Sequence, residues 1–341
     1  MTDRPGHACP KHMTYGPCGG VGVDGSCEIG PEPCVFLHDP VVPWPGMPQA
    51  DAEPGAAGRA FRDLMRRRPV VISGMPAAAL DARSVADTAE VLGGSVDAVL
   101  TGDMPAARVQ FPPAYHAMLV QERGIPVWAG LNCRDRNRVA LEGEIAALAH
   151  AGVAGVHCVT GDHTFTGHRP DAAAVFDLES HELVPRARAA GLLVSVAESP
   201  AAPPVERRGG RLAQKVRAGA RLCLLQFCGE AQDVAAFVRS ARAAGADVPV
   251  LPAVPVIVDE YGARVMASFA AAVLPAGLAD SVRRAGDPVA AGIEAAVCHA
   301  RELLTVAGVA GVVLNGVATG GAETLLARSM AAVGRALGAG R

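Results

Sequence analysis

The stretch LNCRDRNRVALEGEIAALAHAGVAGVHCVTGDHTFTGHRP, which runs from Leu131 to Pro170, decides the fold of this chain. It starts with a strand end and a charged turn, and then continues as a helix with apolar residues at helical spacing: Val139, Ile145 and Leu148. A buried strand over 155–159 runs directly into Thr-Gly-Asp at 160–162. Parallel strands of α/β proteins converge at their carboxyl ends, so a strand that ends in Gly and a carboxylate indicates a functional site.

The same alternation of a short apolar run and an Ala-rich helical segment continues on both sides of this stretch. It predicts strands at 70–73, 98–101, 127–131, 155–159, 192–196, 222–226, 250–253 and 311–314. Strands that alternate with helices over such a length are typical of a (β/α)8 TIM barrel. A doubly wound open sheet is the alternative, but no GxGxxG turn follows the first strand.

Polar residues follow several of these predicted strands. They are Thr101 to Pro105 after the second strand, Thr160 to Asp162 after the fourth, Glu198 to Pro204 after the fifth, and Gln226 at the end of the sixth. In a barrel these strand ends lie on one face, so we expect them to share a pocket.

Composition limits the kinds of partner. The chain has 341 residues, is 50% hydrophobic and carries a formal net charge of −3. This length predicts one large domain with a small appendage, and the near-neutral charge argues against a nucleic-acid partner. Neither a signal peptide nor an apolar run of membrane length is visible, so we expect a cytoplasmic location and no membrane contact.

Four cysteines stand close together near the start of the sequence: Cys9, Cys18, Cys27 and Cys34. Gly and Pro fill the spacers, so the segment cannot bury much apolar surface, and a metal bound by four thiolates would hold it together. Zinc fits such a site, an iron–sulfur cluster is the alternative, and four unrelated buried thiols are the remaining interpretation. The expected organisation is a metal-binding module over 1–38, a Pro-rich linker over 39–58 and the barrel over 59–341.

Several separated motifs resemble the methylenetetrahydrofolate reductase family. They are the CRDRN turn at 133–137, the TGD strand end at 160–162, the VFDL run at 175–178 and the SPAAPP turn at 199–204. In the last of these, Ser199 stands where the family has Asn, and Lys215 and Gln226 match its Lys and Gln. The segment CPKHMTYGPCGGVGVDGSCEI is similar to the small MetV-type module, also called the reductase C-terminal module, of some bacterial reductases.

This resemblance implies an oxidoreductase with bound FAD. Reduced nicotinamide, such as NADH, would reduce the flavin, which would pass hydride to 5,10-methylenetetrahydrofolate to give the 5-methyl form. Asp162 would lie near the flavin and the pterin, Gln226 would bind the pterin, and Lys215 would serve the flavin phosphates or ribityl chain. The full set of implied cofactor-binding residues is Thr101, Asp103, Thr160, Gly161, Asp162, Ser199, Ala202 and Lys215.

The sequence also departs from the family pattern. Ser73 stands where the family has the Glu that assists iminium formation, and Gly130 stands where it has a flavin-contacting His. Glu198, at a predicted strand end, is a candidate replacement acid. The alternatives are a homologue with another folate or a small amine-like substrate, and a non-catalytic folate-binding or electron-relay partner whose Cys module docks a second subunit. A homo-oligomer is expected in each case.

Overall fold

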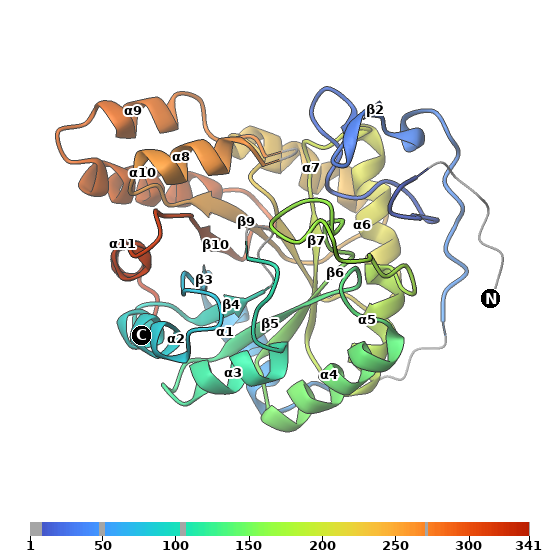
Figure 1. Cartoon of the computed structure of the whole chain (residues 1–341), viewed down its shortest axis with the longest axis horizontal. Helices are drawn as coiled ribbons and strands as arrows, with labels where there is room; N and C mark the ends of the chain where they lie inside the picture. Colours follow the sequence, from blue (N-terminus) through green and yellow to red (C-terminus); the bar gives the residue numbers. More distant parts are fainter. Residues whose placement is uncertain (1–8, 48–51, 103–106, 270–271, 341) are drawn as a thin grey trace.

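The computed structural model describes residues 9–47, 52–102, 107–269 and 272–340, and its centre is a closed barrel of eight parallel strands (Figure 1). The strand order around the barrel is β10-β3-β4-β5-β6-β7-β8-β9, and β10 pairs with both β9 and β3. The strands are β3 (Val70–Gly74), β4 (Ala98–Thr101), β5 (Val127–Asn132), β6 (Gly155–Val159), β7 (Val194–Glu198), β8 (Leu222–Leu225), β9 (Val250–Pro255) and β10 (Gly311–Asn315). The predicted TIM barrel is therefore confirmed.

Helices follow the strands and cover the outside of the barrel (Figure 1). They are α2 (Ala82–Leu92), α3 (Pro113–Gln121), α4 (Arg138–Ala151), α5 (Ser180–Ala189), α6 (Arg208–Arg217), α7 (Ala231–Ala243), α8 (Glu260–Ala267), α9 (Leu278–Arg284), α10 (Pro288–Leu303) and α11 (Glu323–Ala336). In α4, Leu141, Ile145 and Leu148 are buried, whereas Val139 is 79% exposed. Val139 was predicted to share the buried face, but it lies in the first turn, just after the N-cap Asn137, and faces solvent.

An apolar cluster fills the barrel at its amino end. Ile72, Trp128 and Val313 belong to it, and Trp128 is fully buried. Helix α1 (Ala56–Arg67) adds Phe61, whose ring meets Trp128 edge to face at 5.4 Å between centroids. Such pairs add to the stability gained from burying the rings. The filled amino end leaves the carboxyl ends of the strands as the place for a cavity.

The N-terminal segment packs on the barrel, on the side of α6 and α7 (Figure 1). It contains β1 (Ser26–Cys27), β2 (Gly30–Pro33) and the short 3-10 helix η1 (Val35–Leu37). Arg207 donates to the carbonyl oxygens of Phe36 at 2.9 Å and Asp39 at 3.1 Å. The Pro-rich stretch was expected to separate this segment from the barrel, but the two parts are in contact. The boundaries at 38 and 58 stay predictions.

Two glycines inside helices differ in what a side chain would meet. A Cβ at Gly292 in α10 would lie 1.8 Å from the backbone oxygen of Ile257, whereas Gly143 in α4 has open space. We expect Gly292→Ala to lower the free energy of unfolding by about 2 kcal/mol because the helix must move. The control Gly143→Ala should raise it by about 0.5–1 kcal/mol through helix propensity. Urea unfolding measures both, and equal effects would contradict the packing described.

Candidate functional site

A cavity of about 690 Å³ opens at the carboxyl ends of the barrel strands. This volume lies in the range of small-molecule sites. Strand ends supply much of its wall, and the N-terminal segment supplies another part through Lys11, Pro17, Cys18, Gly19, Gly20 and Glu28. Residues separated by more than a hundred positions therefore share one cavity, and the N-terminal segment belongs to the site.

Most of the predicted site residues line this cavity. They are Thr101, Thr160, Gly161, Asp162, Glu198, Ser199, Lys215 and Gln226. Two other predicted residues, Ser73 and Ala202, lie outside it, and Asp103 lies outside the described residues. The expectation that these strand ends share a pocket is met, although lining a cavity does not give each residue the role that the family resemblance implies.

The side chain of Ser73 points away from the barrel interior, toward α11. Side chains alternate along β3, and because Ile72 belongs to the cluster inside the barrel, Ser73 points the other way. Its hydroxyl donates to the Gly74 carbonyl oxygen at 2.8 Å and lies 3.2 Å from the sulfur of Met330 in α11. The catalytic position of Ser73, which rests on its place at the family's Glu, stays a prediction, although its side chain does not line the cavity.

Ala202 contacts the N-terminal segment. It is fully buried against Val21, and its carbonyl oxygen accepts a hydrogen bond of 2.7 Å from Nε of Arg208. This environment does not suit the predicted contact with a cofactor, because the chain itself covers the residue. The turn that precedes α6 therefore serves to hold the N-terminal segment.

Glu198 is buried between two cations. Its Oε2 lies 3.0 Å from Nζ of Lys215, and its Oε1 lies 3.4 Å from Nη1 of Arg208. Burial alone would raise the pKa of Glu198, but Lys215 first and then Arg208 outweigh it and hold the pKa below its ordinary value. A carboxylate that stays ionised is a poor proton donor, so the structure argues against Glu198 as the replacement acid. The ammonium group of Lys215 is likewise already paired, with Glu198.

Asp162 is the cavity carboxyl best suited to hold a proton. Burial raises its pKa, and the negative charge of Glu28 raises it further, while Lys11 and Arg108 act in the opposite direction. Asp162 keeps accessible surface because it faces the cavity. Among the described residues, its carboxylate forms no ion pair within 4.0 Å, so no cation cancels the effect of burial.

The sequence interpretation missed three residues of this site. Lys11 and Glu28 form a buried ion pair at 2.9 Å next to Asp162, and Oε1 of Glu28 accepts a hydrogen bond from the His163 N–H at 3.0 Å.

His157 in β6 lines the cavity, and its Nδ1 lies 2.9 Å from the hydroxyl oxygen of Ser195. Burial first, and then Lys215, lower the pKa of His157 to about 3, so its imidazole is neutral. The only sequence signal for His157 is a polar residue in an otherwise apolar strand.

The four cysteines of the N-terminal segment divide into two environments. Cys34 lies near Cys9 and Cys27, whose charges raise its pKa together with burial, the larger cause. Cys18 faces the cavity, and burial raises the pKa of its thiol to about 11 despite the nearby Lys11. All four are described, yet no three of their sulfur atoms lie within 4.8 Å of one another. The predicted metal site at Cys9, Cys18, Cys27 and Cys34 stays a prediction.

Comparison with known families assigns this barrel. The sequence model of the family described as methylenetetrahydrofolate reductase matches residues 98–318, which include Asp162 and Gln226. The chain belongs to the methylenetetrahydrofolate reductase family. A second model, described as the C terminal of methylene-tetrahydrofolate reductase, matches residues 4–39, although this segment stands at the start of the present chain. No curated protein matches the sequence.

Two solved structures are similar to this methylenetetrahydrofolate reductase family member. An uncharacterised protein from Clostridium thermocellum, which binds two copies of 5-methyl-5,6,7,8-tetrahydrofolic acid, is similar with a TM-score of 0.58 and 11% identity, over 80% of this chain and 97% of that chain. A 2,3-dimethylmalate lyase has a TM-score of 0.47 and 15% identity, over 76% of this chain and 79% of that chain. The first likeness shows the fold alone, and the second is too distant to add to it.

The charges of the cavity bear on the implied FAD. FAD carries two phosphates, but each cation among the described cavity-lining residues is already paired with a carboxylate. The pairs are Lys11 with Glu28 at 2.9 Å, Arg108 with Asp135 at 3.0 Å, Arg211 with Glu179 at 3.2 Å and Lys215 with Glu198 at 3.0 Å. At Gly130, where the family has a flavin-contacting His, a Cβ would lie 2.8 Å from the Thr101 carbonyl oxygen, so a side chain at this position would clash with the backbone.

Removing the buried carboxylate tests the role of Glu198. We expect Glu198→Gln to lower the free energy of unfolding by about 3 kcal/mol at pH 7, because Lys215 and Arg208 keep their buried charges without a partner. The folded-state pKa of Glu198 is depressed, so its contribution is present above the ordinary glutamate range and is lost as the pH falls through the depressed value. The difference between wild type and variant should therefore shrink below about pH 4.

The control for this measurement is Glu142→Gln. Glu142 also pairs with an arginine, Arg186, at 3.2 Å, but its side chain is 54% exposed. Its loss should cost less than about 1 kcal/mol. Urea unfolding at several pH values measures both variants, and an equally small effect at Glu198 would contradict a role for its ion pairs in stability.

Proposed function

We propose that this protein binds a reduced folate in the barrel cavity and acts on its one-carbon unit as an oxidoreductase of the methylenetetrahydrofolate reductase type. The reaction converts 5,10-methylenetetrahydrofolate to 5-methyltetrahydrofolate. The single observation that carries the proposal is that Asp162 and Gln226, which lie within the family match, line the same cavity. The folate-binding protein of Clostridium thermocellum, which has the same fold, supports a folate as the ligand.

Asp162 supplies the acid in this proposal. Opening the five-membered ring of the methylene compound requires a proton on the departing nitrogen, which leaves an iminium carbon that accepts hydride. A carboxyl group whose pKa is raised toward the working pH is suited to give that proton, and the pKa of Asp162 is shifted in this direction by burial and by Glu28. Asp162 then takes the role that the family assigns to the Glu missing at position 73.

Gln226 positions the pterin. Its Oε1 accepts a hydrogen bond from the Phe227 N–H at 3.0 Å, which fixes the side-chain amide at the end of β8. Within the described chain, the amide nitrogen makes no hydrogen bond, so both of its N–H groups are available to a ligand. Oxygen and nitrogen acceptors of a pterin ring match such a donor.

The N-terminal segment completes the site. Lys11 and Glu28 lie beside Asp162, so this segment determines the charge around the proposed acid. Zinc at Cys9, Cys18, Cys27 and Cys34, with an iron–sulfur cluster as the alternative, would require these thiols to move together, and elemental analysis tests both. Because the segment covers the cavity of its own chain, its position favours a role in this site over docking of a second subunit.

An assay must identify the hydride donor. FAD and NADH both carry two phosphates, so the paired cations of the cavity do not distinguish between them. The assay uses the full chain with 5,10-methylenetetrahydrofolate and NADH, without and with added FAD. Folate binding without turnover under both conditions would favour the non-catalytic folate-binding alternative, and no folate binding would overturn the proposal.

Asp162→Asn tests the acid. We expect turnover to fall by about 10²–10⁴-fold while 5-methyltetrahydrofolate still binds, because the amide keeps the shape and loses the proton. The wild-type rate should fall as the pH rises through the raised pKa of Asp162, and the variant should lack this limb. The control is Asp171→Asn, on the same loop but fully outside the cavity. Unchanged turnover in Asp162→Asn would remove this residue from the mechanism.

Gln226→Ala tests recognition of the pterin. Loss of its hydrogen bonds should weaken binding of 5-methyltetrahydrofolate by about 1 kcal/mol, or roughly fivefold in Kd. Isothermal titration calorimetry measures the change. The control is Gln232→Ala, an exposed Gln in α7 that should leave Kd unchanged. Equal Kd values for the two variants would show that Gln226 does not contact the folate.

A further inference from the structure

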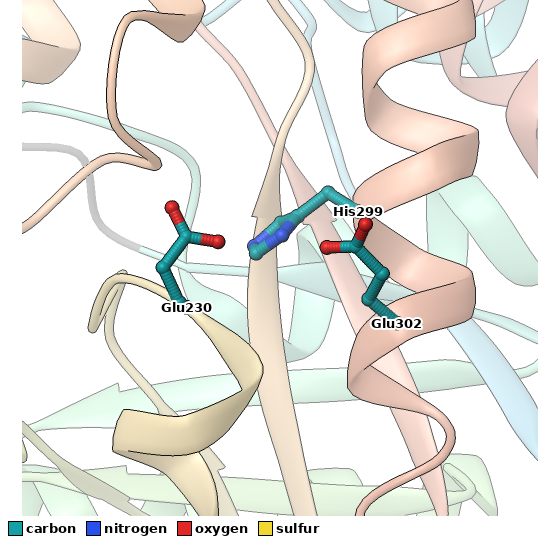
Figure 2. Close-up of side chains that lie close together, drawn as sticks. All are labelled: Glu230, His299 and Glu302. Atoms are coloured by element: carbon teal, nitrogen blue, oxygen red, sulfur yellow. The ribbon is translucent and has the colours of Figure 1, made fainter.

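We propose that Glu230, His299 and Glu302 bind a divalent transition-metal ion on the outer side of the barrel, at a place distinct from the cavity and from the cysteine segment. One ligand atom from each of these residues lies within 4.8 Å of the other two. Figure 2 shows the two carboxylates on either side of the imidazole ring. None of the three residues lines the cavity, so the ion would not contact the proposed folate substrate.

Two helices bring the ligands together. Glu230 is the N-cap of α7, while His299 and Glu302 both belong to α10 (Figure 2). Residues three apart in a helix lie on the same face, so His299 and Glu302 point toward the start of α7 together. The segment that precedes α9 contributes to the arrangement, because the Ala276 N–H donates to Oε1 of Glu230 at 3.1 Å. Hydrogen bonds of this kind orient the carboxylates of metal sites.

His299 is a buried imidazole without a hydrogen-bond partner. It is only 7% exposed, and within the described chain neither ring nitrogen forms a hydrogen bond or an ion pair within 4.0 Å. A buried polar ring generally has a partner, and a bound ion would provide it.

The spacing of the ligand atoms suits an ion. Metal–ligand bonds of about 2.0–2.2 Å place neighbouring ligand atoms about 3–4 Å apart, which is compatible with the observed limit of 4.8 Å. One imidazole and two carboxylates form a nitrogen and oxygen donor set that suits Zn²⁺, Co²⁺ or Mn²⁺, while the imidazole disfavours Mg²⁺ and Ca²⁺. Three protein ligands leave further positions for water.

Such an ion would connect α7, α10 and the segment around Ala276. This segment is continuous with the chain that follows α8, where Ser268 and Phe269 line the cavity. It is also joined to the end of β8 through the bridge between Cys228 and Val273. The site therefore acts as a clamp on one wall of the cavity, and it stabilises the folded chain by mass action.

The test is a titration of the chelator-treated full chain with Co²⁺, followed by absorption spectroscopy. Co²⁺ at the cysteines gives an intense thiolate charge-transfer band, whereas Co²⁺ bound by nitrogen and oxygen gives only weak visible bands. We expect one Co²⁺ of the second kind, and we expect Glu302→Gln to weaken its binding by at least about tenfold. Glu302 is exposed, so this variant should fold normally. His299→Gln should abolish the same binding.

The control is Glu294→Gln, an exposed Glu on the same helix that is not part of the cluster. It should titrate as wild type does. Circular dichroism of each variant verifies the fold. If Glu302→Gln and His299→Gln both titrate as Glu294→Gln does, the cluster binds no metal and the proposal fails. Competition by Mg²⁺ or Ca²⁺ at equal concentration would also overturn it, because it would show an oxygen-only site.

Discussion

The buried guanidinium of Arg208 is the contact on which the arrangement of this protein depends. It lies 3.4 Å from Oε1 of Glu198, and it donates to the carbonyl oxygens of Cys18 at 2.9 Å and Pro203 at 2.7 Å. Breaking a buried ion pair from one side costs several kcal/mol, so these groups are held together as a unit. Arg208 thereby fixes the barrel, the turn before α6 and the N-terminal segment to one another.

This attachment determines the electrostatics of the cavity. The N-terminal segment brings a cation and a carboxylate, Lys11 and Glu28, which pair with each other at 2.9 Å. Their pairing leaves Asp162 without a dedicated cation, and burial and Glu28 raise its pKa although the residue keeps surface that faces the cavity. The cavity therefore combines paired charges with one carboxyl whose pKa is raised.

The sequence was informative where the physical rule is local or periodic. Apolar runs that alternate with helices predicted all eight barrel strands, and the rule that parallel strands converge placed Asp162 and Gln226 in one cavity. It failed where a single residue decides the direction of a side chain, because Ser73 and its neighbour Ile72 face opposite sides of β3. Nor could it place Lys11 beside Asp162 or pair Glu198 with Lys215, since these contacts depend on tertiary packing.

The end of β3 lies close to the Asn315 side chain. The residue of β3 that follows Ser73 is Gly74, and a Cβ at Gly74 would lie 2.8 Å from Oδ1 of Asn315 at the end of β10. Asn315 thus occupies the space that a longer side chain from β3 would need, and Asn315 itself lines the cavity. An acidic side chain at position 74 would therefore have to displace the Asn315 side chain. Asp162, which follows β6, faces the cavity and has a raised pKa, and this supports its choice as the proposed acid.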